Sequence, residues 1–431
     1  MTETEPLRVA IACQGGGSHT AFTAGVLKRL LGAEELAEVE VVGLSGTSGG
    51  AVCALLAWSA LLDGNPAAAG NRLEAFWADN SATTPLEQLV NTWVVWAARL
   101  ENVIVMPAIS PYDNPLEVQV LREFRAMLEQ QVDFEQLAAK AEQAGESGPK
   151  LVLGAVDVLS GNFRAFNSRR EPITADMVLA SAAIPNLFRA VHLPDGTYWD
   201  GLFSQNPPVG ELVDTRPDEL WVIQINPRRR DREPRTVVEI ADRRNELSGN
   251  LSLHQELSFI EKIDQLLAEG RLGEDGKYKQ ILVRLIELTR PPQSRSLGTA
   301  SKLNRDPAFI AELLAHGEVK AEEFLAARSF ERAWRDGDPD AVLGCFADDA
   351  ELWSAAPFLD QAGLRGRQQI GRFVRERLTT DLHVDPTRKQ VAGDRVSWTV
   401  QAWRDDPSRP VLGHAEAKFQ DGKVVTLRLG G

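Results

Sequence analysis

The stretch that decides the fold reads Val39-Glu-Val-Val-Gly-Leu-Ser-Gly-Thr-Ser48-Gly-Gly50 and continues as Ala51-Val-Cys-Ala-Leu-Leu-Ala-Trp58. An apolar run that breaks into glycines around one serine and then resumes predicts a strand, a sharp turn and a helix. The pentapeptide Gly46-Thr-Ser48-Gly-Gly50 fits the pattern G-x-S-x-G, in which the turn beside a nucleophilic serine is too tight for a β-carbon on either side. Ser48 is then expected at the first turn of a helix, where free N–H groups favour developing negative charge. The alternative is that Ser48 is only a helix N-cap.

The chain begins with a similar unit. Residues 7–13 predict a buried strand, Gln14-Gly15-Gly16-Gly17 a loop, and residues 20–31 a helix with its apolar side chains on one face. Two such units predict an α/β sheet of parallel strands, whose ligands collect at the carboxyl ends of the strands. The loop matches neither common phosphate-binding glycine motif, so we favour an oxyanion hole formed by the N–H groups of Gly15, Gly16 and Gly17. A simple tight turn is the alternative.

Length and composition set the broad class. With 431 residues, 43% of them hydrophobic and 25% charged, the chain is expected to form two folded domains. A formal net charge of −14 argues against nucleic acid and anionic membrane surfaces as electrostatic partners. Three scattered cysteines predict neither a disulfide framework nor a zinc site, and no cofactor is expected. We find no signal-peptide pattern and no stretch that would span a bilayer, so a cytoplasmic location is expected.

The most apolar segment covers residues 89–109. Together with the residues just before it, its first part forms one wide apolar face of a predicted helix: Leu86, Leu89, Val90, Trp93, Val94, Trp96 and Ala97. Residues 103–109 add a second apolar piece. Side chains at such spacing more often belong to the core than to a lipid contact. If Ser48 acts on lipids, this segment is expected to form an acyl-chain wall or cap, and any contact with a membrane or a lipid droplet is expected to be apolar and local.

Four further elements are predicted before residue 230: strands at residues 150–157, 161–166 and 219–226, and a small-residue helix at residues 174–183. Asp195-Gly196 predicts a hairpin turn, and Asp200 stands at the end of the short strand that follows. An aspartate before a glycine is usually part of a turn. Taken alone, the residue type therefore gives Asp200 no functional role.

Four motifs together resemble the patatin-like phospholipases in order and spacing: Gly15-Gly16-Gly17, Gly46-Thr-Ser48-Gly-Gly50, Ala180-Ser-Ala-Ala-Ile-Pro185 and Asp200-Gly201. The stretch Ser301-Lys-Leu-Asn-Arg-Asp-Pro-Ala-Phe309 is similar to that family too. The resemblance covers residues 8–321 and implies a three-layer α/β/α fold. It also implies lipid ester hydrolysis by a Ser-Asp dyad, in which Ser48 attacks the ester carbonyl and Asp200 is the base. The same resemblance places the oxyanion hole on the amides of residues 15–17.

The histidines are consistent with a dyad. A serine–histidine–acid triad would need a downstream histidine, and both His254 and His316 fall in helical contexts instead of glycine-rich strand ends. A carboxylate whose pKa is raised by partial burial accepts the serine proton directly, and the reaction then passes through an acyl-enzyme. Two positions depart from the family pattern. His19 stands where the glycine loop commonly has arginine, and Leu202 stands where the aspartate motif commonly has a small residue.

The last hundred residues have a different pattern. After a helix at residues 309–327, the sequence predicts helices at residues 329–346, split at Gly337, a strand at 350–353, a helix at 366–378, and strands at 382–391, 395–403, 411–419 and 424–429. This order resembles the nuclear transport factor 2-like, or SnoaL-like, domains, in which a curved sheet closes over a helix and leaves a pocket. The candidates to line that pocket are Trp353, Trp398, Trp403, His383 and His414, although most residues of such strands belong to the core or the surface.

The sequence therefore predicts a patatin-like domain at residues 1–322 and a SnoaL-like α+β cone at residues 323–431. The expected function is hydrolysis of lipid or other carboxylic esters, a step of lipid degradation, without a metal. Two alternatives stay open. One is a binding or scaffold protein of weak or no activity, whose cone binds a small ligand or mediates a homodimer. The other is acyl transfer to an alcohol other than water.

Overall fold

The computed structural model describes residues 5–100, 110–114, 117–185, 187–230, 232–273, 278–289, 297–355, 363–378, 383–392, 395–403, 411–420 and 422–430. The apolar piece predicted at residues 103–109 lies outside the described residues. Two compact units make up the chain. Unit 1 comprises Met1–Ile281 and Arg290–Glu318, and unit 2 comprises Leu282–Thr289 and Val319–Gly431.

The sheet of unit 1 confirms the predicted α/β class. Its strands lie in the order β7-β1-β2-β3-β6-β5, with β4 also paired to β3. Neighbours among β7, β1, β2 and β3 are parallel, whereas β4, β5 and β6 pair antiparallel. The strands are β1 Leu7–Cys13, β2 Val39–Gly46, β3 Lys150–Asp157, β4 Phe163–Asn167, β5 Val191–Leu193, β6 Gly196–Asp200 and β7 Glu219–Gln224.

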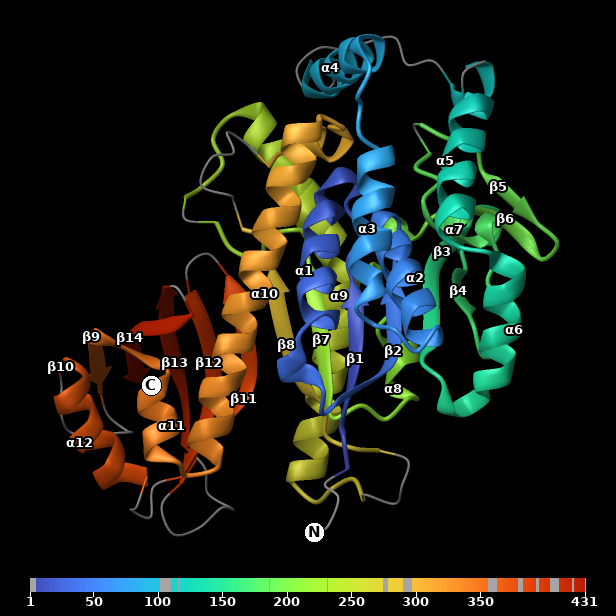
Figure 1. Cartoon of the computed structure of the whole chain (residues 1–431). Helices are drawn as coiled ribbons and strands as arrows, with labels where there is room; N and C mark the ends of the chain where they lie inside the picture. The colour runs from blue at the N-terminus through green and yellow to red at the C-terminus, as the bar shows by residue number, and fades with distance from the viewer. Residues whose placement is uncertain are drawn as a thin grey trace. The chain divides into compact units, whose positions relative to one another are not determined.

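Helices cover both faces of this sheet, which gives the predicted three-layer arrangement (Figure 1). Helices α1, α2 and α3 lie over one face, and α9 lies over the other. The helices are α1 Ala21–Leu31, α2 Gly49–Leu62, α3 Ala68–Asp79, α4 Pro85–Leu100, α5 Glu117–Gln131, α6 Phe134–Ala144, α7 Ala175–Ser181, α8 Gly210–Val213 and α9 Val237–Ala268. Three of the short 3₁₀ helices matter below: η1 Gly17–Thr20, η5 Gly201–Phe203 and η6 Thr299–Leu303.

The register of the strands brings distant loops to one edge of the sheet. Cys13, at the end of β1, pairs with Gly46 of β2 and with Ile223 of β7. The glycine loop after β1 and the serine turn after β2 therefore leave the sheet side by side. Asp200, at the end of β6, pairs with Ala155 of β3, the strand next to β2. Helix α2 is buried from Gly50 to Ala60, so the residue that precedes the helix is firmly placed.

Unit 2 has the α+β architecture expected of a nuclear transport factor 2-like cone. Its strands lie in the order β10-β9-β14-β13-β12-β11-β8, and β8 pairs with β11 in parallel. Its elements are β8 Leu282–Glu287, α11 Pro339–Gly344, β9 Phe346–Ser354, β10 Leu364–Arg365, α12 Arg367–Leu378, β11 His383–Ala392, β12 Arg395–Trp403, β13 Val411–Gln420 and β14 Lys423–Gly430. Strand β8 is not among the strands predicted from the sequence, because a single apolar run far from the other strands gives no sign of its pairing partner.

Helix α10 differs from expectation. It runs without a break over Pro307–Arg335, whereas the sequence pattern predicts one helix that ends at residue 327 and another that begins at residue 329. The stretch Ala326-Ala-Arg-Ser-Phe330 contains no glycine or proline to end a helix. Phe324, Ala327 and Phe330 are all buried, so the apolar face also continues across the expected break.

Candidate active site

The turn between β2 and α2 forces Ser48 into a strained backbone conformation. Its φ is 57° and its ψ is −132°, and in the described part of the chain only Arg216 is another non-glycine residue with positive φ. Such strain is retained mainly where the surrounding structure requires it, often at active sites. Ser48 stands at the N-cap position of α2, but its side chain makes no capping hydrogen bond. The N-cap alternative therefore does not explain the serine.

The two glycines of the pentapeptide are required by close backbone contacts. A β-carbon added to Gly46 would lie 2.3 Å from the carbonyl oxygen of Gly50. One added to Gly50 would lie 2.3 Å from the carbonyl oxygen of Cys13. Both distances are far below van der Waals contact. The turn can therefore form only with glycine at both positions, as the pattern G-x-S-x-G predicts.

Ser48 and Asp200 meet in the interior of unit 1. Ser48 is 6% exposed and Asp200 is 1% exposed. Oδ1 of Asp200 accepts a 2.8 Å hydrogen bond from the amide of Leu202, whereas Oδ2 is buried and has no hydrogen-bond partner. The Ser48 side chain is near enough to stabilise the Asp200 carboxylate, although no hydrogen bond of ordinary geometry joins them. Catalytic hydrogen bonds are often long before substrate binds.

The environment of Asp200 brings the pKa of its carboxyl group close to neutral pH. Burial raises the pKa of Asp200 to about 7, and this effect outweighs three groups that lower it. These groups are the Leu202 amide, the Ser48 side chain and the positive charge of Lys302. A general base works best when its pKa lies near the working pH. The carboxylate is thus able to accept and return a proton under neutral conditions.

The glycine loop lies against Ser48. A β-carbon added to Gly15 would lie 3.0 Å from the β-carbon of Ser48. The Gly15 amide already donates a 2.7 Å hydrogen bond to Oδ1 of Asn206. Among the hydrogen bonds of the described residues, none uses the amide of Gly16, Gly17 or Gly49. These amides remain able to bind a negatively charged oxygen.

The 3₁₀ helix η6 supports the glycine loop from the other side. Gly17 has a φ of 55°, and a β-carbon added to it would lie 2.3 Å from the carbonyl oxygen of Lys302. Nε2 of His19 lies 2.8 Å from the hydroxyl of Ser301. Burial, and then the charge of Lys302, lower the pKa of His19 to about 3. His19 is therefore neutral, and position 19 carries no positive charge.

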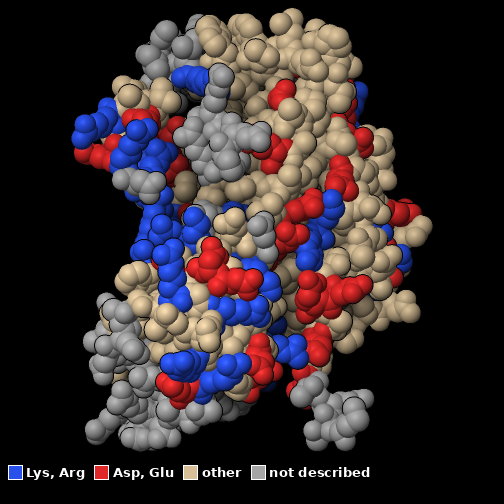
Figure 2. Space-filling model, turned by 60° about the vertical axis from the view of Figure 1, so that its left-hand side comes forward, with Lys and Arg blue, Asp and Glu red and all other residues tan. Residues whose placement is uncertain are grey.

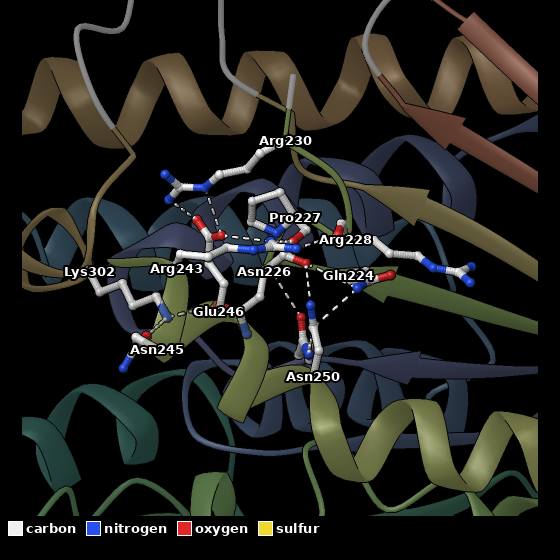
Figure 3. Close-up of polar contacts among 11 residues, drawn as sticks. Gln224, Asn226, Pro227, Arg228, Arg230, Arg243, Asn245, Glu246, Asn250 and Lys302 are labelled. Atoms are coloured by element: carbon white, nitrogen blue, oxygen red, sulfur yellow. Dashed lines mark hydrogen bonds and ion pairs between the residues drawn. The ribbon is translucent and has the colours of Figure 1, made fainter. Parts of the chain in front are cut away.

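Lys302 brings a buried positive charge to this region. Its amine donates to Oδ1 of Asn226 at 2.8 Å and to Oδ1 of Asn245 at 2.7 Å (Figure 3). Burial lowers the pKa of Lys302 to about 8, while Glu246, Asp242 and Asp200 act in the opposite direction. The amine is thus mostly protonated at neutral pH.

Glu246 of the same cluster is held by two arginines. The guanidinium groups of Arg230 and Arg243 lie 2.6 Å and 3.0 Å from its carboxylate oxygens (Figure 3). Glu246 therefore has its own cationic partners, and the positive charge of Lys302 remains able to lower the pKa of Asp200.

Several of these residues were not singled out as site residues by the sequence. Lys302 and Ser301 belong to the stretch Ser301–Phe309, whose resemblance to the family was the available signal. Asn206 carried no signal, because a lone asparagine among prolines is typical of a turn. In the part of the chain that the structure describes, no three His, Cys, Asp or Glu side chains are arranged to hold a metal ion. Among the described helices, none is long and apolar enough to cross a membrane.

Comparison with known proteins agrees with the two-part organisation. A family model described as patatin-like phospholipase matches residues 11–213, and one described as SnoaL-like domain matches residues 326–427. The search of curated proteins found no match.

Solved structures similar to part of this chain include three nuclear transport factor 2-like proteins. The protein from Mesorhizobium loti is 25% identical, with a TM-score of 0.23, over 26% of this chain and 92% of its own. The protein from Burkholderia xenovorans is 16% identical, with a TM-score of 0.22, and the match covers 25% of this chain and 87% of that protein. The protein from Cytophaga hutchinsonii is 7% identical, with a TM-score of 0.21, and the match covers 25% of this chain and 87% of that protein. From the family matches, this chain carries a patatin-like phospholipase domain, which supports lipid acyl hydrolase activity in general, followed by a SnoaL-like domain.

Proposed function

We propose that the protein hydrolyses carboxylic ester bonds of lipids through a Ser48–Asp200 dyad. Oγ of Ser48 attacks the ester carbonyl carbon while Oδ2 of Asp200 takes the hydroxyl proton, and the carbonyl electron pair moves onto oxygen. Collapse of this intermediate breaks the ester bond, and the departing alkoxide takes the proton from Asp200. Water then attacks the Ser48 ester, Asp200 again accepts a proton, and the carboxylic acid leaves as the proton returns to Ser48.

The oxyanion is assigned to free backbone amides. We assign Gly16 and Gly17 as donors from the glycine loop and add Gly49, whose amide directly follows the nucleophile. Gly15 remains part of the oxyanion loop, but its amide is shared with Asn206. The positive end of α2 adds to the stabilisation of negative charge at Ser48.

The observation that carries the proposal is the pairing of a strained serine with a buried carboxylate. Ser48 has positive φ and no capping role, and Oδ2 of Asp200 is buried without a partner. Leaving a buried carboxylate oxygen unsatisfied costs free energy, on the order of 1–3 kcal/mol. A reaction that uses this oxygen as a base accounts for both features.

The direct test is turnover of p-nitrophenyl esters of increasing chain length by wild type, Ser48→Ala and Asp200→Asn. We expect each substitution to lower kcat at least about a thousandfold. Ser160→Ala, which removes an exposed serine between β3 and β4, is the matched control and is expected to keep wild-type rates. Turnover that survives in Ser48→Ala would overturn the proposal. A competing alcohol such as glycerol distinguishes hydrolysis from acyl transfer, because transfer gives a new ester in place of the free acid.

A binding function of the SnoaL-like domain is the second candidate. Its cavity is lined mainly by apolar side chains, including Phe330, Trp334 and Trp398. The carboxylate of Glu331 in its wall already accepts a hydrogen bond from Trp398 and pairs with Arg284 and Lys389. Such a lining suits a small apolar ligand. If no ester is turned over, ligand binding or homodimer formation by this domain becomes the leading account. Calorimetric titration of apolar ligands into wild type and Trp398→Ala is its test.

A further inference from the structure

Helix α4 turns its apolar side outward. Five of its large apolar side chains are more than half exposed: Leu86 at 70%, Leu89 at 65%, Val90 at 53%, Trp93 at 61% and Trp96 at 52%. At 100° per residue they fall within one third of the helix circumference. We call these five residues the α4 face. A core helix would bury these residues, so the structure does not support the core alternative for this segment.

The opposite side of α4 is fixed to the protein. Nδ2 of Asn91 donates a 2.9 Å hydrogen bond to Asn304, and its Oδ1 accepts a 2.7 Å hydrogen bond from the amide of Arg305. Val95 on the same side is only 8% exposed. The first turn is closed by Thr84 and Glu87, whose side chains exchange hydrogen bonds with each other's backbone amides. The helix is therefore well formed, and its polar side is the side that contacts the protein.

Helix α4 is connected to the candidate active site through two contacts. Helix α4 packs on η6, and η6 packs on η1 at the end of the glycine loop. Lys302 and Ser301 of η6 are the residues that touch Gly17 and His19. Whatever covers the α4 face is thus held near the end of the molecule where Ser48 lies.

The chemistry of the α4 face fits a lipid surface without net charge. None of its five residues is charged, and Figure 2 shows a mostly uncharged surface at the top of the molecule, where Figure 1 places α4. The net charge of −14 disfavours anionic lipids. Tryptophan prefers the boundary between water and hydrocarbon, and an amphipathic helix with tryptophan and leucine on one face lies in the plane of that boundary. At 16 residues, α4 is too short to span a bilayer.

We propose that the α4 face docks the protein on the surface of zwitterionic or uncharged lipid aggregates. This proposal rests on the proposed function in one respect. Hydrolysis of lipid esters is the reason to expect that the α4 face binds a lipid surface and not another protein. The helix inserts its tryptophan and leucine side chains among the lipid headgroups while Asn91 keeps it attached to unit 1. The glycine loop and Ser48 are then presented to the lipid layer.

The test is sedimentation of the full chain with phosphatidylcholine vesicles. The double variant Leu89→Ser, Trp93→Ser removes the centre of the α4 face, and we expect its partition coefficient to fall about tenfold or more, because interfacial binding scales with buried apolar area. The matched control is Leu251→Ser, Phe259→Ser, which removes two exposed apolar side chains from α9, at 60% and 72% exposure, and is expected to stay within about twofold of wild type. Circular dichroism and thermal unfolding check that both variants fold.

Other results would overturn docking. One is that the wild-type protein does not bind vesicles. A second is that the α9 control variant loses as much vesicle binding as the α4 variant. A third is that the wild-type protein self-associates in the absence of lipid and the α4 variant does not. The last outcome would assign the α4 face to a second copy of the chain. Ser48→Ala separates the two proposals, since it is expected to bind vesicles like wild type and to hydrolyse no ester. Binding without hydrolysis by wild type removes the proposed function alone, and hydrolysis without binding removes docking alone.

Discussion

Ser48 and Asp200 are held by the same short segment at the C-terminal end of α7. The amide of Ser48 donates a 3.1 Å hydrogen bond to the carbonyl oxygen of Ser181, and the amide of Asp200 donates a 3.0 Å hydrogen bond to the carbonyl oxygen of Ala183. Two residues that are far apart in sequence are thus set relative to one another by neighbouring carbonyl groups. This gives the motif Ala180-Ser-Ala-Ala-Ile-Pro185 a structural reason, because it fixes the distance across which a proton would move.

Removing the Ser181 hydroxyl should loosen this arrangement. Its oxygen accepts from the Ser48 amide at 3.1 Å and donates to the carbonyl oxygen of Gly154 at 2.7 Å. We expect Ser181→Ala to destabilise the fold by about 1–2 kcal/mol and to lower kcat on the order of tenfold, because small displacements of reacting groups are costly. Denaturant unfolding and ester turnover measure the two effects. Wild-type kcat in a folded Ser181→Ala protein would show that the hydroxyl does not position Ser48.

The pH dependence of turnover should report the ionisation of Asp200. Its pKa is raised to about 7 by burial, and only the carboxylate accepts the Ser48 proton. We expect kcat/KM to level off above about pH 7 and to fall about tenfold per pH unit below it. A profile that stays flat down to pH 5 would mean that another group is the base.

Asp200→Asn should stabilise the protein while it abolishes turnover. Between pH 4 and 7 the unfolded chain has lost the Asp200 proton and the folded chain keeps it, so stability falls as the pH rises through this window. Above about pH 7 the folded protein carries the full cost of a buried carboxylate. We expect Asp200→Asn to raise the free energy of unfolding by on the order of 2–4 kcal/mol at pH 8, and by little at pH 4.

Unfolding in urea at the two pH values measures this difference. Asn keeps an oxygen to accept from the Leu202 amide, so the comparison isolates the charge. A variant less stable than wild type at pH 8 would contradict the claim that burial of the Asp200 carboxylate destabilises the folded protein.

Lys302 should set the position of the pH profile. Its charge lowers the pKa of Asp200, so Lys302→Met is expected to move the acidic limb of kcat/KM to higher pH. Glu246 keeps Arg230 and Arg243 in this variant, so the rest of the cluster remains paired. Lys262→Met, at an exposed lysine of α9, is the control and is expected to leave the profile in place. An unshifted profile in Lys302→Met would limit Lys302 to supporting the glycine loop.

The sequence was sufficient for the elements that bring the glycine loop and the Ser48 turn to one edge of the sheet. The apolar runs at β1, β2, β3 and β7 are each followed by glycines or turns, and parallel strands bring such turns to one edge. The role proposed for Asp200 needed the family resemblance, because its burial depends on β3 and α7, which no local pattern around Asp200 indicates. Lys302 and Asn206 could not be placed beside the glycine loop from the sequence, because each contacts partners far along the chain. The direction in which the apolar face of α4 points could not be predicted either, since an apolar stripe has the same spacing whether it faces the core or solvent.

The claim on which the account depends most is that Ser48 forms a covalent intermediate with the substrate's acyl group. Its most direct measurement is intact-mass and peptide analysis of the protein after reaction with a fluorophosphonate, a reagent that modifies activated serines. We predict one adduct per chain, located on the peptide that contains Ser48, absent in Ser48→Ala and strongly slowed in Asp200→Asn. An unmodified Ser48, or an adduct on another serine that persists in Ser48→Ala, would contradict it.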